Sequence, residues 1–151
     1  MLEWNDHGDF EHMEQICTGR ADPGKIFRVM KVDYFKQAGM KELIYCRGKQ
    51  YQQIIIDFGQ MTPERFLEWE RSDQKLLLVS LSEWCLEACL EFFQEKRKVC
   101  KKGWHCAVVF GSDETRRQLC KKTGLEIGRI PFSVDAFAID RKAMKYLEQF
   151  D

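Results

Sequence analysis

The stretch "QIIIDFG", from Gln53 to Gly59, is an apolar run that ends in a carboxylate. Its isoleucines fall on both alternating faces, which is typical of a strand in a parallel sheet covered on both sides. Asp57 follows the run directly, and Gly59 comes two residues later. We therefore expect a buried strand that carries Asp57 at its carboxyl end.

Other apolar runs and helical patterns alternate along the rest of the chain. Expected strands are Phe27 to Val32, Lys75 to Leu81, His105 to Gly111, Leu125 to Phe132 and the end of a strand in the opening "MLEW". Expected helices are Asp6 to Cys17, Met40 to Arg47, one starting at Thr62, Ser82 to Lys102, Ser112 to Thr123 and one containing Ile139 to Phe150. This alternation predicts a three-layer α/β fold with a mostly parallel sheet and helices on both faces, in one domain of residues 1–151.

The composition is that of a soluble globular protein. Of 151 residues, 44% are hydrophobic and 32% charged, with a formal net charge of zero, so nothing steers the chain as a whole toward nucleic acid or a membrane. The opening residues lack the basic and apolar regions of a signal peptide, and we expect a cytoplasmic location. The seven cysteines contain no C-x-x-C pair. We interpret them as small apolar core residues rather than a disulfide framework.

A near-match to a phosphate-binding loop lies in "CTGRADPGKIF", Cys17 to Phe27. The spacing Gly-x-x-x-x-Gly-Lys is present, but Ile26 stands where the loop needs Ser or Thr. Such a loop follows a strand and opens a helix, whereas here a helical pattern precedes it and a strand follows. We therefore predict a surface turn.

Ligands of open parallel sheets bind at the carboxyl ends of the strands. The opening strand delivers Glu3 and Asn5 there, and the run of Leu125 to Phe132 delivers Pro131 and Phe132. Asp57, just clear of a rigid strand, has the position needed to hold a magnesium ion or its waters. The alternative is that Asp57 only caps a turn and binds no ligand.

The order of four stretches resembles the second half of a MinD/ParA-type (deviant-Walker) P-loop ATPase. They are "YQQIIIDFGQ", "KLLLVSLSEWCLEAC", "HCAVVFG" and "LEIGRIPFSVDAFAIDRKAMKYLEQF", and "MLEWND" resembles the end of the family's second strand. The resemblance covers about Leu2 to Phe150. It implies a P-loop NTPase-like sheet, incomplete at the N-terminus, and ATP or ADP with Mg²⁺ as the cofactor.

The resemblance also implies site residues. Asp57 matches the magnesium-side aspartate and Gly59 the glycine that senses the γ-phosphate. Glu3 and Asn5 fall where the family places its second-strand acid. The turn that borders the adenine is matched by Pro131 and Phe132.

The chain departs from the family in three ways. The P-loop, which precedes the family's second strand, is missing; the switch glycine follows the aspartate by two residues rather than three; and Phe110-Gly111 replaces the adenine-reading asparagine. Because P-loop amides and lysine hold the β- and γ-phosphates, we expect weak nucleotide contact and no hydrolysis by this chain alone. A sheet that lacks its central strand has an open edge, which predicts self-association or a protein partner.

Two alternatives stay open. In the first, Met1 is not the natural start, and the P-loop of an active MinD/ParA-like ATPase lies upstream of it. In the second, the chain is a receiver-like or flavodoxin-like regulatory domain with no nucleotide role. Glu3 and Asp6 imitate the acidic cluster of a receiver, Asp57 its phospho-accepting aspartate, and Lys101 or Lys102 its late lysine, but no Lys-Pro follows the fifth strand.

Overall fold

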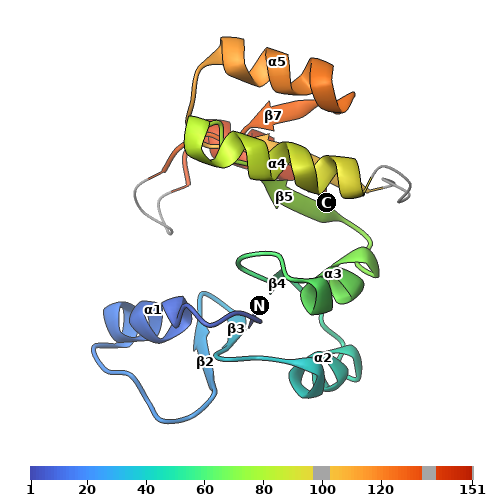
Figure 1. Ribbon diagram of the computed structural model, residues 1–151. Helices are drawn as coiled ribbons and strands as arrows, with labels where there is room; N and C mark the ends of the chain where they lie inside the picture. Colours follow the sequence, from blue (N-terminus) through green and yellow to red (C-terminus); the bar gives the residue numbers. More distant parts are fainter. Residues whose placement is uncertain (97–102, 134–138, 151) are drawn as a thin grey trace. The chain divides into compact units, whose positions relative to one another are not determined.

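A computed structural model describes residues 1–96, 103–133 and 139–150, and its strands and helices alternate as in an α/β protein (Figure 1). The chain divides into two compact units, Met1–Glu70 (unit 1) and Arg71–Asp151 (unit 2). Each unit has its own sheet. Four of the five strand pairings between described residues are parallel, which confirms the predicted α/β class and the predominance of parallel pairing.

Unit 1 has a mixed four-stranded sheet. Its elements are β1 (Leu2–Glu3), α1 (Asp9–Thr18), β2 (Ile26–Val29), β3 (Val32–Phe35), α2 (Met40–Arg47), β4 (Ile56–Asp57) and α3 (Pro63–Glu70). The strand order is β2-β3-β1-β4, with β1 parallel to both of its neighbours. The carboxyl ends of β1, β3 and β4 therefore share one edge of the sheet.

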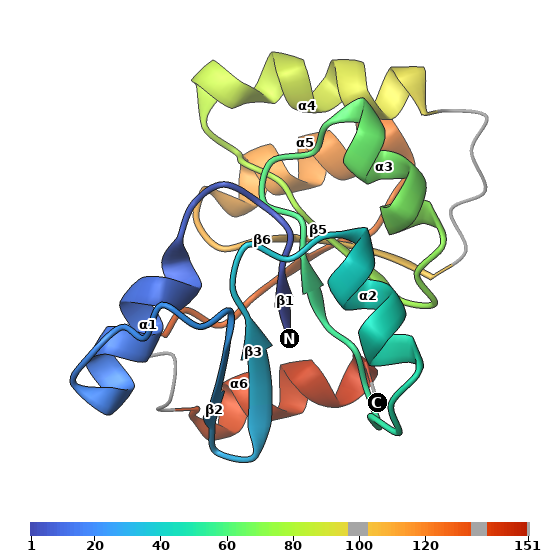
Figure 2. The same cartoon turned by 90° about the horizontal axis from the view of Figure 1, so that it is seen from below.

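Unit 2 has a parallel three-stranded sheet in the order β5-β6-β7. Its elements are β5 (Lys75–Leu78), α4 (Glu83–Glu95), β6 (Trp104–Val108), α5 (Asp113–Thr123), β7 (Ile127–Arg129), α6 (Arg141–Leu147) and the 3-10 helix η1 (Glu148–Phe150). Helices α4 and α6 lie on opposite sides of this sheet (Figure 2). The predicted extension of the Ser82 helix to Lys102 lies partly outside the described residues.

The expected single strand from Phe27 to Val32 is wrong. The structure has a hairpin there, in which β2 and β3 pair antiparallel and Val29 faces Val32. Met30 and Lys31 form its two-residue turn with φ of 49° and 67°. Two positive φ values suit the right-handed twist of the flanking strands, but Asn-Gly or Asp-Gly normally supplies them, so the sequence carried no turn signal here.

The expected long strand from Gln53 to Gly59 is also much shorter in the structure. Only Ile56–Asp57 forms β4. Its partner β1 has two residues, and the ladder is held by hydrogen bonds from the Leu2 and Trp4 amides to the carbonyls of Ile55 and Asp57, each 2.8 Å. Because its partner is so short, β4 does not extend back over Ile54 and Ile55, and the Ile55 side chain is half exposed.

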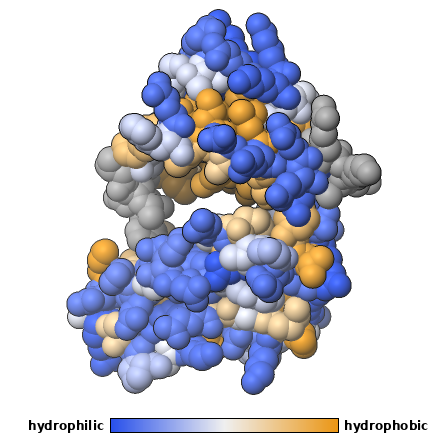
Figure 3. Space-filling view, viewed as in Figure 1, coloured by the Kyte–Doolittle hydropathy of each residue, from blue (hydrophilic) through white to orange (hydrophobic). Residues whose placement is uncertain are grey.

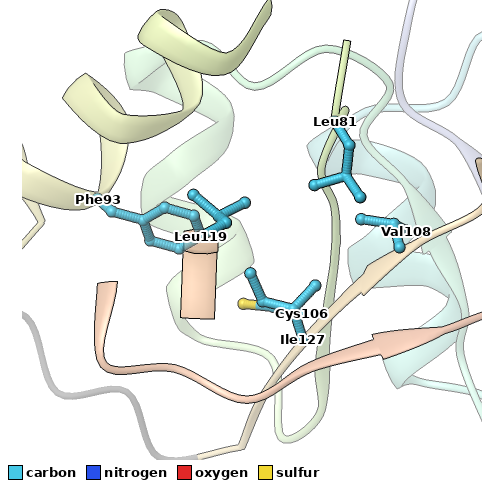
Figure 4. Close-up of a cluster of buried hydrophobic side chains, with 6 residues drawn as sticks. All are labelled: Leu81, Phe93, Cys106, Val108, Leu119 and Ile127. Carbon is cyan, nitrogen blue, oxygen red and sulfur yellow. The ribbon is translucent and has the colours of Figure 1, made fainter. Parts of the chain in front are cut away.

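Each unit has a separate hydrophobic core. Unit 2 buries a cluster that joins its sheet to α4 and α5, and Figure 4 shows its members: Leu81, Phe93, Cys106, Val108, Leu119 and Ile127. The main cluster of unit 1 consists of Leu2, Phe35, Ala38, Leu43 and Cys46. Full burial of one large aliphatic side chain contributes about 1.5–3 kcal/mol, so both clusters stabilise their sheets substantially.

Local signals place some helix ends where the sequence predicts them. Ser112 caps α5 by accepting a 3.0 Å hydrogen bond from the Thr115 amide, and Gly124 ends it in the left-handed conformation. Thr62 similarly precedes α3 and accepts a hydrogen bond from the Arg65 amide. These positions depend on neighbouring residues alone, which is why the sequence reveals them.

Cysteines are only partly core residues. Cys46 and Cys106 are buried, and Cys89 and Cys120 are partly buried. Two thiols are exposed: Cys17 at the end of α1 and Cys85 on α4. All six cysteines within the described residues are free thiols, so the expectation of a core position is wrong for two of them.

Candidate functional site

The first candidate site lies at the carboxyl ends of β1 and β4. The parallel register places Glu3 opposite Asp57 and Leu2 opposite Ile56. Asn5 lies two residues after Glu3, just beyond the carboxyl end of β1. The structure therefore brings together four of the six residues that the sequence singled out, since Gly59 also lies against Asn5.

Asn5 joins the two strand ends. Its side-chain amide donates a 3.2 Å hydrogen bond to the backbone carbonyl of Asp57. Its side-chain oxygen accepts a 2.9 Å hydrogen bond from the His7 amide. Asn5 is almost fully buried, and both polar ends of its side chain have hydrogen-bond partners at the strand ends.

Asp57 presents a carboxylate to solvent at the carboxyl end of β4. Its side chain is partly exposed, and Oδ1 accepts a 2.9 Å hydrogen bond from the Gly59 amide. Gly59 has a φ of 57°, and a Cβ at this position would lie 2.8 Å from Cβ of Asn5. Glycine is required here for both reasons. The Asp57-x-Gly59 turn thus fixes the carboxylate against β1 and leaves its second oxygen available.

Glu3 has a different environment from Asp57. It is completely buried, and its two oxygens accept hydrogen bonds from the Phe10 amide at 3.0 Å and the Gln37 amide at 3.4 Å. Phe10 is in the first turn of α1, whose N-cap residue Gly8 has no side-chain cap. Glu3 therefore supplies the negative group that the helix start favours, and its carboxylate faces the protein interior.

A cleft of about 410 Å³ opens beside Asn5. It is lined by Trp4, Asn5, Asp6, Gly8, Gln37, Ala38 and Arg65. The Arg65 guanidinium is mostly buried, donates a 2.8 Å hydrogen bond to the Asp6 carboxylate and a 3.2 Å one to the Gln60 carbonyl. Within this lining Arg65 and Asp6 are paired with each other, and the Asn5 side chain already bonds to Asp57 and His7.

Sequence reasoning did not find Arg65. The residue belongs to no motif, and it reaches Asp6 across 59 positions of chain. Only the tertiary structure shows that α3 returns beside the end of β1. The one local signal is the Thr62-Pro63 start of α3, which fixes the helix but not its partner.

Pro131 and Phe132 belong to unit 2 and do not line this cleft. They follow β7, and Phe132 is 60% exposed. Its ring lies 5.0 Å from the ring of Phe110, which follows β6. The two aromatic rings together form an exposed apolar pair at the carboxyl ends of the unit 2 strands, where the sequence predicts the base-binding turn.

The Gly-x-x-x-x-Gly-Lys stretch is a turn between α1 and β2, as predicted. A buried ion pair holds it: Lys36 Nζ lies 2.6 Å from Glu14 Oε2. The same groups bind the loop backbone, because Lys36 donates to the Asp22 carbonyl and Glu14 accepts from the Asp22 amide. The stretch thus has a structural anchor, and its amides do not open a helix.

Among residues 1–96, 103–133 and 139–150, no three His, Cys, Asp or Glu side chains are grouped so that they could hold a metal ion. Asp57, the residue that the sequence predicts as the metal ligand, belongs to no such group. Mg²⁺ commonly binds one or two carboxylates and completes its shell with water and substrate phosphates. A single well-placed carboxylate fits that chemistry.

No helix within the described ranges is long and apolar enough to cross a membrane. Comparison of the chain with family models, with curated proteins and with solved structures gives no match.

Proposed function

We propose that this chain is a MinD/ParA-like, ATPase-related domain that contacts magnesium-bound nucleotide weakly and does not hydrolyse it alone. The observation that carries the proposal is the register of β1 and β4, which sets Glu3 opposite Asp57 and Asn5 beside it. Parallel strands that deliver polar groups to one carboxyl edge form the usual ligand-binding position of α/β sheets. The resemblance of the sequence to this ATPase family suggests the ligand, which is ATP or ADP with Mg²⁺.

Asp57 is the residue that would meet the magnesium ion. The Gly59 amide orients its carboxylate, and one oxygen stays available for the ion or an ion-bound water. Glu3 and Asn5 support this arrangement from within, by fixing α1 and the backbone of β4. Within unit 2, Phe110 and Phe132 form an exposed aromatic pair, in the part of the chain where the resemblance implies the base-binding turn of Pro131 and Phe132.

The expected affinity is low. Nucleotide phosphates are normally held by several convergent amides and a lysine, and the Gly19 to Lys25 turn does not supply them. A dissociation constant of about 1 mM, equivalent to about 4 kcal/mol, is the magnitude expected from a few contacts. Without phosphate-binding amides the attacking water and the leaving phosphate are not positioned, so hydrolysis is not expected.

Calorimetric titration with ATP, in Mg²⁺ and in EDTA, tests the proposal. We expect Mg²⁺ to tighten binding to the natural chain and expect Asp57→Asn to abolish that effect. Asparagine keeps the hydrogen bond from the Gly59 amide and removes the charge that the ion needs. Asp73→Asn, an exposed position in unit 2, is the matched control and should leave the Mg²⁺ effect intact. Binding that ignores Mg²⁺, or equal behaviour of both variants, contradicts the proposal.

We also propose a protein partner that pairs with an open strand edge. In the described sheets β4 and β5 each have one neighbouring strand, and Ile55, Leu76 and Leu78 beside these edges are exposed. Exposed apolar edge strands tend to pair with another strand. Leu78→Lys should weaken binding of the partner, because a charge on an edge strand opposes pairing with a strand of another protein. Leu67→Lys, at an equally exposed position on α3, is the control. No nucleic-acid or membrane partner is proposed.

A further inference from the structure

We propose that α4 of one copy of this chain docks against α6 of a second copy. The two surfaces carry opposite charges, both have exposed apolar side chains, and they belong to the same unit. The inference does not rest on nucleotide binding, and it concerns helices rather than the open strand edges. Its basis is the chemistry of these two helix surfaces.

Helix α4 carries more apolar side chains than it buries in the core of unit 2. Leu86, Cys89, Leu90 and Phe93 face the sheet, in or against the core of unit 2. Trp84 is 92% exposed, and Cys85 and Ala88 on the neighbouring part of the helix are exposed as well. Figure 3, viewed as in Figure 1, shows hydrophobic colouring on unit 2, where α4 runs. A large exposed aromatic beside apolar neighbours is typical of an interaction surface.

An acidic row runs beside this apolar surface. Its members are Glu83, Glu87, Glu91 and Glu95, spaced four residues apart and all exposed. None of them forms an ion pair with a residue in the described ranges. Like charges at this spacing lie on one helix face and repel each other. A basic partner surface would remove that repulsion, so the row favours a cationic occupant.

Helix α6 has the complementary surface. Its inner side contacts the sheet through the Tyr146 ring, which lies near Gly128, and in the following η1 the Phe150 ring lies 4.8 Å from the His105 ring. Its outer side carries Arg141, Lys142 and Lys145, all exposed. Met144 and Leu147 are also about half exposed. The helix thus presents cations and apolar side chains together, as a partner for α4 requires.

The geometry predicts the kind of assembly. Because α4 and α6 lie on opposite sides of the unit 2 sheet, the two surfaces of one copy cannot meet each other (Figure 2). A contact between different surfaces is heterologous, and copies then add in series unless a ring closes. We expect the mean mass to rise above that of a 17.9 kDa monomer with increasing concentration.

Sedimentation velocity of the full chain, from about 1 µM to about 1 mM, tests the inference over the range of weak interfaces. Two charge-reversed variants are compared with it: Glu87→Lys/Glu91→Lys and Lys142→Glu/Lys145→Glu. Each should associate at least about tenfold more weakly, because like charges then face each other. An equimolar mixture of the two charge-reversed variants should associate as the natural chain does, because α4 of one variant and α6 of the other then carry opposite charges. Lys121→Glu/Lys122→Glu on α5 is the control and should change nothing.

Thiol protection gives an independent readout. Cys85 lies on the proposed surface, and Cys17 is an exposed thiol in unit 1. Alkylation of Cys85 should slow as the concentration rises, while that of Cys17 should not. A chain that stays monomeric over this concentration range overturns the inference; the acidic surface of α4 would then suit a basic protein other than a second copy. Association that survives both charge reversals also overturns it and points to strand-edge pairing instead.

Discussion

The ammonium group of Lys36 lies 2.6 Å from Oε2 of Glu14, and both side chains are almost completely buried. The pair connects the residue after β3 to α1, and it holds the Gly19 to Lys25 turn through the backbone of Asp22. A buried ion pair is costly to break from one side, because the remaining charge has neither water nor partner.

Lys36→Met should therefore lower the free energy of unfolding by about 3–5 kcal/mol. The double variant Lys36→Met/Glu14→Leu should recover much of that loss, because no uncompensated charge remains. Denaturation in urea measures both. Lys41→Met, at an exposed lysine of α2, is the control and should change stability by less than about 0.5 kcal/mol. Equal losses for Lys36→Met and Lys41→Met would show that the pair contributes little.

Gly59→Ala should destabilise the carboxyl edge of β4. The backbone there is left-handed, and the added methyl would lie 2.8 Å from Cβ of Asn5. We expect a loss of about 1–3 kcal/mol in thermal unfolding. Gly24→Ala is the matched control, because its φ is not positive and the nearest atom is an Asp22 oxygen at 3.5 Å. A melting temperature equal to that of the control would contradict the tight contact with Asn5.

Tyr51 should titrate at unusually high pH. Its hydroxyl donates a 2.7 Å hydrogen bond to the Asp33 carboxylate, which raises the pKa of Tyr51 from 10.0 to about 12. The protonated form is the one favoured in the folded state. The stabilisation is therefore complete below the ordinary pKa and is lost as the pH rises through about 12.

Ultraviolet absorbance of the phenolate, taken as the difference between the natural chain and Tyr51→Phe, measures this titration. Asp33→Asn should return the pKa of Tyr51 toward 10.0, because it removes the negative charge that opposes ionisation. An unchanged titration curve in Asp33→Asn would rule out the hydrogen bond as the cause.

The cysteines should fall into fast and slow classes toward a disulfide reagent. Cys17 and Cys85 are exposed and should react fast in dilute native protein. Burial raises the pKa of the Cys46 and Cys89 thiols, which lowers the amount of reactive thiolate. Cys17→Ser and Cys85→Ser should each remove one fast equivalent. A fast phase that both substitutions leave unchanged would contradict the exposure of these thiols.

The parts of this fold that depend on local chemistry could be predicted from the sequence. Ser112 and Gly124 bound α5 because a hydroxyl cap and a left-handed glycine are residue-specific signals. The meeting of Glu3 with Asp57 also follows from a general rule, since neighbouring parallel strands end at one edge. That rule gives proximity alone; it does not reveal that Glu3 turns inward to two amides while Asp57 stays partly exposed.

What the sequence could not show depends on packing and on backbone conformations without a residue signature. Met30 and Lys31 adopt a turn that other residues usually make, so the hairpin was hidden in an apolar run. The cleft beside Asn5 needs Arg65, whose distance in sequence from Asp6 conceals their ion pair. The hairpin thus depends on a local backbone conformation, whereas the cleft depends on contact between segments that are distant in sequence.

The division of the chain after Glu70 places two of its four tryptophans in each unit. Trp4 and Trp69 fall in unit 1, and Trp84 and Trp104 fall in unit 2. Trp69 is 4% exposed and Trp84 is 92% exposed, so one emits from an apolar environment and the other from water. Intrinsic emission therefore contains a separate signal from each half of the molecule. Replacing one pair by phenylalanine would let the other report on which half responds first to heat, denaturant or a bound ligand.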